Sequence, residues 1–237
     1  MADRKSPVSI QLAVESISGG STDVTVEVRH VYNFGYAARD STGAQRHVDE
    51  MRALGMPAPS QLPAIFPVPA DRVRTAGELT VSGDDTYGEV EFALVNTDQG
   101  WLVTIASDHT DLEVETVNMA KAKASSPDVV GDTAWRLDEV GEQWDDCVLR
   151  LWGQNPDGTE ELVQSGKVGH LLPPADMQRI LAERSSTTLE PGTVILSGTL
   201  DGEPTPGKVA WRAELEDPHS GRKLELAYSL NRLALEL

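Results

Sequence analysis

The chain has 237 residues, a length that fits one hydrophobic core or a main domain with a smaller lobe. Its 38 acidic and 20 basic residues give a formal net charge of −18. Since no basic run is present, this balance argues against binding to nucleic acid or to anionic membrane surfaces. With 39% hydrophobic residues, the chain can still bury a core, unlike a disordered acidic tail.

The cysteine content and the N-terminal residues bear on the cellular compartment in which the protein is expected. Cys147 is the single cysteine, so one chain can build neither a disulfide nor a cysteine-based zinc site. Gln11 and Glu15 interrupt the N-terminal region before any apolar run reaches signal-peptide length, and no run approaches a membrane span. We therefore expect a cytoplasmic protein.

Short alternating segments with turns between them predict a mainly β protein with a few helices. Val24, Val26 and Val28 alternate with polar residues, and the same alternation recurs over residues 209–215 and 224–230. Turn sequences at 155–158 and 217–221 separate strand pairs that we expect to be hairpins.

Three segments have helical spacing instead: residues 41–54, 110–122 and 174–184. Five prolines fall between residues 57 and 69, which predicts an extended and poorly hydrogen-bonded connection. This connection predicts a small N-terminal lobe over residues 1–77 and a main domain over residues 78–237.

Several common catalytic patterns fail on inspection. Residues 202–208 have the spacing of a phosphate loop, but Val209 replaces the magnesium-binding hydroxyl residue and two prolines remove backbone donors. A surface loop is the better interpretation. The chain also contains neither a G-x-S-x-G nucleophile elbow nor an H-E-x-x-H zinc motif.

The segment 88–95 is more informative. As a strand, it projects Glu89 and Glu91 from one face, two residues apart, with apolar residues behind them. A solvated strand face is the more common origin of such a pair. A third carboxylate would favour a hard divalent cation, and Asp108 supplies one after the predicted strand 101–106.

Two further groups accompany these acids. Lys121 and Lys123 bring positive charge near them, either to stabilise an enolate or as ordinary helix-end charges. His47 and Glu50 are three residues apart on the predicted helix 41–54, so the carboxylate can orient the imidazole as a general base. Taken alone, the H-x-x-E spacing is common.

The order of these pieces resembles the fumarylacetoacetate hydrolase superfamily over roughly residues 32–230. The most specific motif is L-E-P-G-T-V-I-L-S-G-T at 189–199, which is similar to the superfamily's L-x-P-G-D-V-I-x-T-G-T strand with Thr193 in place of Asp. The segments GYAARD, HVDEM, PAIFPVP, GEVEFALV and SDHTD look like an uncharacterised bacterial and fungal branch of it.

The resemblance implies a mixed β-roll or barrel with a small N-terminal lobe. It implies a Mg²⁺ or Mn²⁺ site, with Ca²⁺ as another candidate ion, at Glu89, Glu91 and Asp108. It makes Lys123 catalytic and places His47 and Glu50 on a lid helix, with Arg39 and Thr199 as candidate substrate contacts. Superfamily members are commonly dimers, so a homodimer is expected.

The implied activity is a hydrolase that cleaves a carbon–carbon bond in a 2,4-dioxo acid or acylpyruvate through a metal-stabilised enolate. A decarboxylase, tautomerase or hydratase acting on a 2-oxo acid is the alternative within the same fold, and a noncatalytic binding protein is the third. Leu112 stands where the superfamily has an arginine that meets substrate, and the lysine expected near Pro67 is absent. The metal site is therefore expected to be kept and the substrate pocket altered, with local positive charge drawing a small anionic substrate to an acidic protein.

Overall fold

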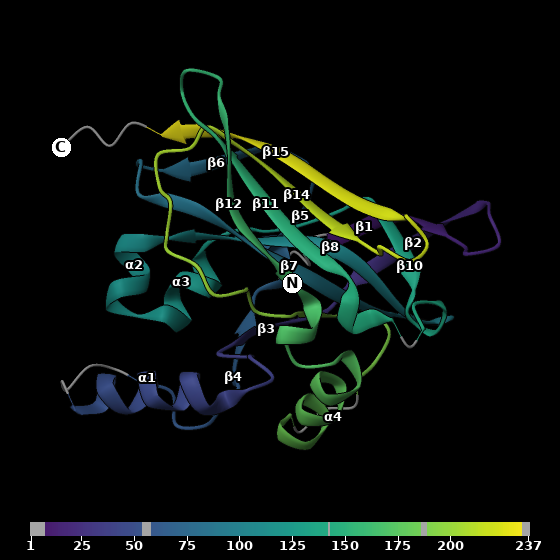
Figure 1. The fold of residues 1–237 in the computed structure, drawn as a ribbon, viewed down its shortest axis with the longest axis horizontal. Coiled ribbons are helices and arrows are strands. Elements are labelled where there is room, and N and C mark those ends of the chain that lie inside the picture. The colour runs from purple at the N-terminus through teal and green to yellow at the C-terminus, as the bar shows by residue number, and fades with distance from the viewer. Residues whose placement is uncertain (1–7, 54–57, 142, 186–188, 234–237) are drawn as a thin grey trace, which may run out of the picture.

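The computed structural model describes residues 8–53, 58–141, 143–185 and 189–233, apart from the side chains of His47, Glu50 and Met51. The expected mainly β fold with a few helices is confirmed (Figure 1). The helices are α1 Ser41–Ala53, α2 Leu112–Val117, α3 Met119–Ser125 and α4 Pro174–Arg184. None of these described helices combines the length and the hydropathy needed to cross a membrane.

Fifteen strands fall within the described ranges. They are β1 Val8–Glu15, β2 Ser21–Val28, β3 His30–Gly35, β4 Ala64–Val68, β5 Val73–Thr75, β6 Gly77–Ser82, β7 Thr86–Thr97, β8 Gly100–Asp111, β9 Asp128–Val130, β10 Thr133–Arg136, β11 Val148–Gln154, β12 Glu160–Lys167, β13 Thr193–Leu196, β14 Ala210–Glu216 and β15 Lys223–Leu233. The hairpins expected at 155–158 and 217–221 join the antiparallel pairs β11–β12 and β14–β15.

These strands form two sheets. A ten-stranded sheet has the main order β2-β1-β10-β8-β7-β13-β3-β4, with β5 and β9 joined to it through β8, and it curls into a half-barrel. A five-stranded sheet has the order β12-β11-β14-β15-β6. The predicted boundary at residue 77 falls between β5 and β6, and strands on its N-terminal side hydrogen-bond to β10 and β13 of the larger sheet.

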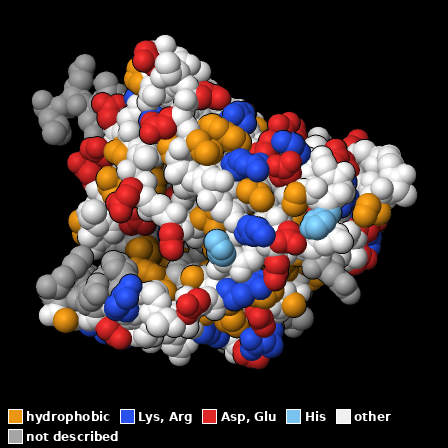
Figure 2. Space-filling model, in the orientation of Figure 1, with side chains coloured by type: hydrophobic (Ala, Val, Ile, Leu, Met, Phe, Trp, Pro, Cys, Tyr) orange, Lys and Arg blue, Asp and Glu red, His pale blue; other side chains and the backbone are white. Residues whose placement is uncertain are grey.

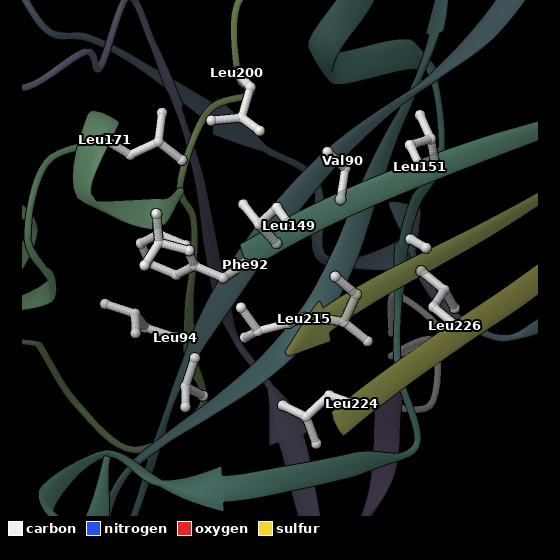
Figure 3. Close-up of a cluster of buried hydrophobic side chains, with 14 of the residues drawn as sticks. Val90, Phe92, Leu94, Leu149, Leu151, Leu171, Leu200, Leu215, Leu224 and Leu226 are labelled. Atoms are coloured by element: carbon white, nitrogen blue, oxygen red, sulfur yellow. The ribbon is translucent and has the colours of Figure 1, made fainter. Parts of the chain in front are cut away.

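The long hairpin of β7 and β8 separates two layers of side chains. Val90, Phe92 and Leu94 pack in the core that also contains residues of β11, β14 and β15, as Figure 3 shows. Ala93 and Val95 alternate with them and pack in a second cluster on the other face. Because successive side chains of a strand point to opposite faces, Glu89 and Glu91 share the face of Ala93, away from the five-stranded sheet.

Helix boundaries follow from local capping. Asp40 accepts a hydrogen bond from the backbone N–H of Thr42 (3.0 Å) at the start of α1. Helix α4 begins with Pro174, where a missing N–H costs nothing. Both helices match the predicted segments 41–54 and 174–184 closely.

The helix predicted over residues 110–122 is wrong in its start and its continuity. Strand β8 continues through Asp111, whose side chain accepts from Val114 N (3.1 Å) and caps α2. Asn118 has extended backbone angles, ends α2 and caps α3 through Lys121 N. As a consequence, Val117 at the end of α2 is 74% exposed.

The proline-rich segment also differs from its prediction, because it contains a strand. β4 pairs antiparallel with β3, with Pro67 opposite Tyr32. β4 stands at the end of the strand order, so a proline without an N–H is tolerated on its outer side.

A buried histidine lies between the sheets behind the Glu89 face. His109 is 1% exposed, and its Nδ1 lies 3.1 Å from the Tyr228 hydroxyl. Burial, with a smaller contribution from Arg232, lowers the pKa of His109 to about 3. Since the unfolded histidine titrates near its ordinary pKa of about 6.5, the unfolded chain binds a proton between these two values that the folded chain does not.

We therefore expect His109 to reduce stability as the pH falls below about 6.5, by up to about 1.4 kcal/mol per pH unit. His109→Gln, which can keep a hydrogen bond to Tyr228, should flatten the dependence of the unfolding free energy on pH between 6.5 and 4.5. Urea unfolding in EDTA at three pH values measures this, with His30→Gln at an exposed position as the control. Equal pH slopes for wild type and His109→Gln would contradict the assignment.

Candidate active site

Three carboxylates from the β7–β8 hairpin converge on one point. Glu89 pairs in register with Asp108, and Glu91 follows Glu89 on the same face. One oxygen from each of Glu89, Glu91 and Asp108 lies within 4.8 Å of the others. Asp108 was expected at a strand end, but it lies inside β8, where strand pairing rather than a turn places it beside Glu89.

A lysine from α3 enters this group. The Lys123 Nζ donates to Glu89 Oε2 at 2.7 Å and also to Asp108 Oδ2. Burial alone would lower the pKa of Lys123, but Asp108, Glu89 and Glu91 together raise it well above its usual value. Lys121 is exposed on the same helix, so Lys123 is the lysine that contacts the acids.

The carboxylates are short of positive charge. Burial raises the pKa of Glu89 to about 7, with Lys123 opposing the shift, and burial together with Asp108 raises the pKa of Glu91 well above its ordinary value. Glu91 Oε1 and Asp108 Oδ1 are buried and accept no hydrogen bond from the described residues. Hard oxygen donors with unused lone pairs in a buried site fit a hard divalent cation, so these residues can hold Mg²⁺ or Mn²⁺.

Two donors from neighbouring elements hold the acids in place. Gly198 N donates to Glu91 Oε2 (3.0 Å), and Asn33 Nδ2 donates to Asp108 Oδ2 (3.0 Å). Gly198 has a φ of +76°, and a Cβ there would lie 2.4 Å from the Phe34 carbonyl oxygen. A glycine is therefore required for this backbone N–H to reach Glu91.

A fourth acid, Asp128, lies beside the group. It begins β9 and pairs in register with Asp108. Its side chain is fully buried with neither oxygen hydrogen-bonded among the described residues, and burial together with Asp108 raises its pKa well above the ordinary value. Nothing in the sequence around Pro127 and Asp128 indicated this position, because it depends on the pairing of β9 with β8.

A cavity of about 450 Å³ opens from the carboxylates toward α1. Glu89, Glu91 and Lys123 line one end, and the loop after β13 lines another wall from Gly198 to Gly202. Helix α1 contributes Gly43, Ala44 and Arg46. Figure 2 shows the corresponding hollow between α1 and the α2–α3 pair, with apolar side chains visible inside it.

His47, the expected general base, and Glu50 both lie on α1, but their side chains are outside the described residues. Positions 47 and 50 follow Gly43 by four and seven residues on α1. Helical periodicity therefore places these backbone positions on the same face of α1 as Gly43.

The two candidate substrate contacts have different surroundings. Thr199 lines the cavity, and its hydroxyl donates to the Val90 carbonyl (2.9 Å). Arg39 makes a two-pronged ion pair with Asp145 (2.6 and 2.7 Å) and lines a neighbouring cavity rather than this one.

Arg46 is a cavity residue that sequence reasoning missed. It is exposed on α1 and forms no ion pair within the part of the chain that the structure describes. Leu112, which stands where the superfamily has an arginine, starts α2 and packs against the main core. Besides Lys123, the described cation that lines the cavity therefore comes from α1 rather than from the end of β8.

Comparisons with known proteins agree with this fold. A family model described as "Protein of unknown function (DUF2848)" matches residues 34–228. A search of curated protein sequences finds no match.

Among solved structures, a hexagonal crystal form of 2-keto-3-deoxyarabinonate dehydratase superposes with a TM-score of 0.65 at 18% identity, covering 87% of this chain and 75% of that chain. A structure of 2-keto-3-deoxy-D-arabinonate dehydratase complexed with magnesium and 2,5-dioxopentanoate gives 0.61 at 18% identity, covering 89% and 76%. An apo form of that enzyme gives 0.61 at 16% identity, covering 87% and 74%. At such identities the likeness shows the fold, and the expected fumarylacetoacetate-hydrolase-like fold is confirmed.

Lys123→Met tests the electrostatic part of the site. Removing the ammonium leaves two buried carboxylates unpaired, which should cost about 3–5 kcal/mol of stability without metal. Saturating Mg²⁺ should raise the melting temperature of this variant more than that of wild type, since the ion replaces the lost positive charge.

Lys208→Met is the matched control. Lys208 is also buried and binds Glu161 and Asn155 away from the cavity. Its variant should be destabilised without any extra response to Mg²⁺, and an equal Mg²⁺ response in both variants would refute the model.

Proposed function

The chain belongs to the DUF2848 family of proteins of unknown function, and from that premise we propose that it is a metal-dependent enzyme that forms the enolate of a 2-oxo acid. The observation that carries the proposal is the contact of the Lys123 ammonium with two of three converging carboxylates at one end of a cavity. The solved structures with the same fold add support, because one of them holds magnesium and an oxo acid.

Glu89, Glu91 and Asp108 would hold the cation, which when bound would polarise the two oxygens of a 2-oxo acid and lower the free energy of its enolate. Lys123 stabilises the same negative charge from the protein side. An ammonium has three N–H donors, and Glu89 and Asp108 engage two of them. The third is available to an enolate or carboxylate oxygen of the substrate.

Arg46 is the proposed contact for the substrate carboxylate, since it lines the cavity as a cation without an ion pair to the described residues. Thr199 donates its proton to the Val90 carbonyl and already accepts from Gln164 Nε2 (3.0 Å), so its oxygen would offer one remaining lone pair to a hydroxyl of the substrate. Arg39, held by Asp145 at the neighbouring cavity, would meet only the distal part of a longer substrate.

The reaction we favour is elimination of water from a 2-oxo-3-deoxy acid. His47, oriented by Glu50, would accept the proton from C3, and the electron pair of that C–H bond would form the enolate. The enolate then re-forms the C2 carbonyl as the C3=C4 double bond forms and the C4–O bond breaks. The departing hydroxide takes the proton held by His47 and leaves as water. The support is the fold shared with dehydratases, one of them bound to an oxo acid.

Hydrolytic cleavage of a 2,4-dioxo acid or acylpyruvate is the second candidate. Here His47 would accept a proton from water, which attacks the C4 carbonyl carbon, and the C3–C4 bond breaks to leave the same enolate on the 2-oxo acid fragment. The specific support is the spacing of His47 and Glu50 along the helix whose Gly43 lines the cavity. Decarboxylation and tautomerisation would use the same enolate with a different proton transfer.

Metal binding can be tested without any substrate. Glu89→Gln combined with Glu91→Gln removes two charged oxygen ligands, so Mg²⁺ and Mn²⁺ affinity should fall by about 100-fold or more. Isothermal calorimetry on folded protein measures this. Glu78→Gln, at an exposed position on β6, should leave the affinity unchanged. Unchanged affinity in the double variant would rule out the metal site.

Enolate formation can be tested independently of the final reaction. In D₂O with Mg²⁺, the protein should exchange the C3 protons of 2-oxobutanoate, as followed by ¹H NMR. His47→Ala and Lys123→Met should each slow this exchange by about 100-fold or more, whereas Lys121→Met at an exposed position should not.

Product analysis then separates the two candidates. A 2-oxo-3-deoxy acid should lose water with the wild-type protein, while release of pyruvate from an acylpyruvate would favour hydrolysis. Metal-dependent ligand binding without any C3 exchange would instead identify a noncatalytic binding protein.

A further inference from the structure

A second cavity of about 210 Å³ adjoins the candidate active site. Its walls are mainly apolar and include Tyr36, Pro59, Phe66, Val117, Met119 and Ala120. Tyr36, Glu115 and Met119 line both this cavity and the one that contains the carboxylates. The two cavities therefore adjoin at these three residues.

The local fold explains why apolar groups are left uncovered there. The break at Asn118 between α2 and α3 leaves Val117 74% exposed at the cavity wall. On the opposite side, the ring of Phe66 from β4 lies over Gly35, where a Cβ would be only 2.8 Å from the ring. Glycine at position 35 thus lets the ring lie against the backbone.

Size and charge define what this space accepts. An apolar cavity of roughly 150 Å³ is enough to bind benzene, so about 210 Å³ can hold a phenyl group or a short alkyl chain. Glu115 stands at the junction of the two cavities, and its carboxylate accepts a hydrogen bond from the Tyr87 hydroxyl (2.5 Å). A negative charge at this point repels an anionic tail and tolerates a neutral one.

We infer that the substrate is a 2-oxo acid whose chain beyond C4 is an uncharged apolar tail, alkyl or aryl, that occupies the cavity between Phe66 and Val117. This inference rests on the proposed function for the position of the oxo-acid end. The tail adds affinity through burial of apolar surface, and each methylene that is buried should tighten binding by about fourfold.

Calorimetry on the Mg²⁺-loaded protein tests the inference with a series of ligands. Oxalate and pyruvate probe the carboxylate end alone, while 2-oxobutanoate, 2-oxohexanoate and phenylpyruvate add tails of increasing size. We expect affinity to rise along the series by about fourfold per methylene. A 2-oxo acid that is hydroxylated beyond C4, and 2-oxoglutarate with its anionic tail, should gain nothing over pyruvate.

Ala120→Phe fills the cavity from an exposed position on α3 and should abolish the gain from the tail while leaving oxalate affinity unchanged. Val117→Asp places a charge at the wall and should do the same. Ala182→Phe, at an exposed position on α4 that lines neither cavity, is the matched control and should keep the gain.

Different outcomes contradict the proposed function and the apolar subsite. If oxalate and pyruvate do not bind in a Mg²⁺-dependent manner, the proposed function is wrong. If they bind but the tail series is flat, if hydroxylated or anionic tails bind as well as apolar ones, or if Ala120→Phe keeps the gain, the apolar subsite is wrong and the proposed function stands.

Discussion

The structure depends on an electrostatic imbalance among buried groups. Glu89, Glu91, Asp108 and Asp128 are four acids around a single lysine, Lys123, in a space largely closed to water. Burying unpaired charge is costly, so the remaining negative charge must be neutralised by protons or by a cation. The pKa values of Glu89, Glu91 and Asp128 are raised, so without metal these groups tend to be neutralised by protons. A divalent ion neutralises the site while leaving the carboxylates ionised. The same imbalance that makes the metal-free site costly makes it a good cation site.

Strand alternation keeps these buried acids apart from the hydrophobic core. On β7, Glu89 and Glu91 alternate with Val90 and Phe92, which bury the other face in the inter-sheet core. A slip of one residue in the register of β7 against β8 would bring the acids into that core and the apolar groups to the cavity. The extensive packing of the second sheet therefore fixes the register, and the register holds the acids together. Donors from β3 and the loop after β13 then fix the individual oxygens through Asn33 and Gly198.

Sequence could predict what is local or periodic. Alternation predicted the Glu89 and Glu91 face, and capping and proline signals predicted α1 and α4. The prediction from sequence failed where tertiary pairing overrides the local pattern. Strand β8 continues to Asp111 because β7 pairs with it over its whole length. Asn33 and Asp128 left no signal, because each reaches the site through pairings between segments far apart in the chain. Arg46 was hidden for a related reason: its role depends on where α1 lies relative to the cavity.

The expected attraction of an anionic substrate to the site depends on the bound metal ion. Among the described side chains, the cavity is lined by five acids and two bases, with Asp40, Glu115 and Asp201 added to Glu89 and Glu91 against Lys123 and Arg46. Even if Glu89 and Glu91 are protonated, three acids face two bases, so the protein alone does not make the cavity positive. A divalent ion offsets two of these negative charges at the carboxylates, while Arg46 adds a local donor from α1. An anionic oxo acid should therefore bind more tightly to the metal-loaded site than to the metal-free site, because the ion removes part of the repulsion.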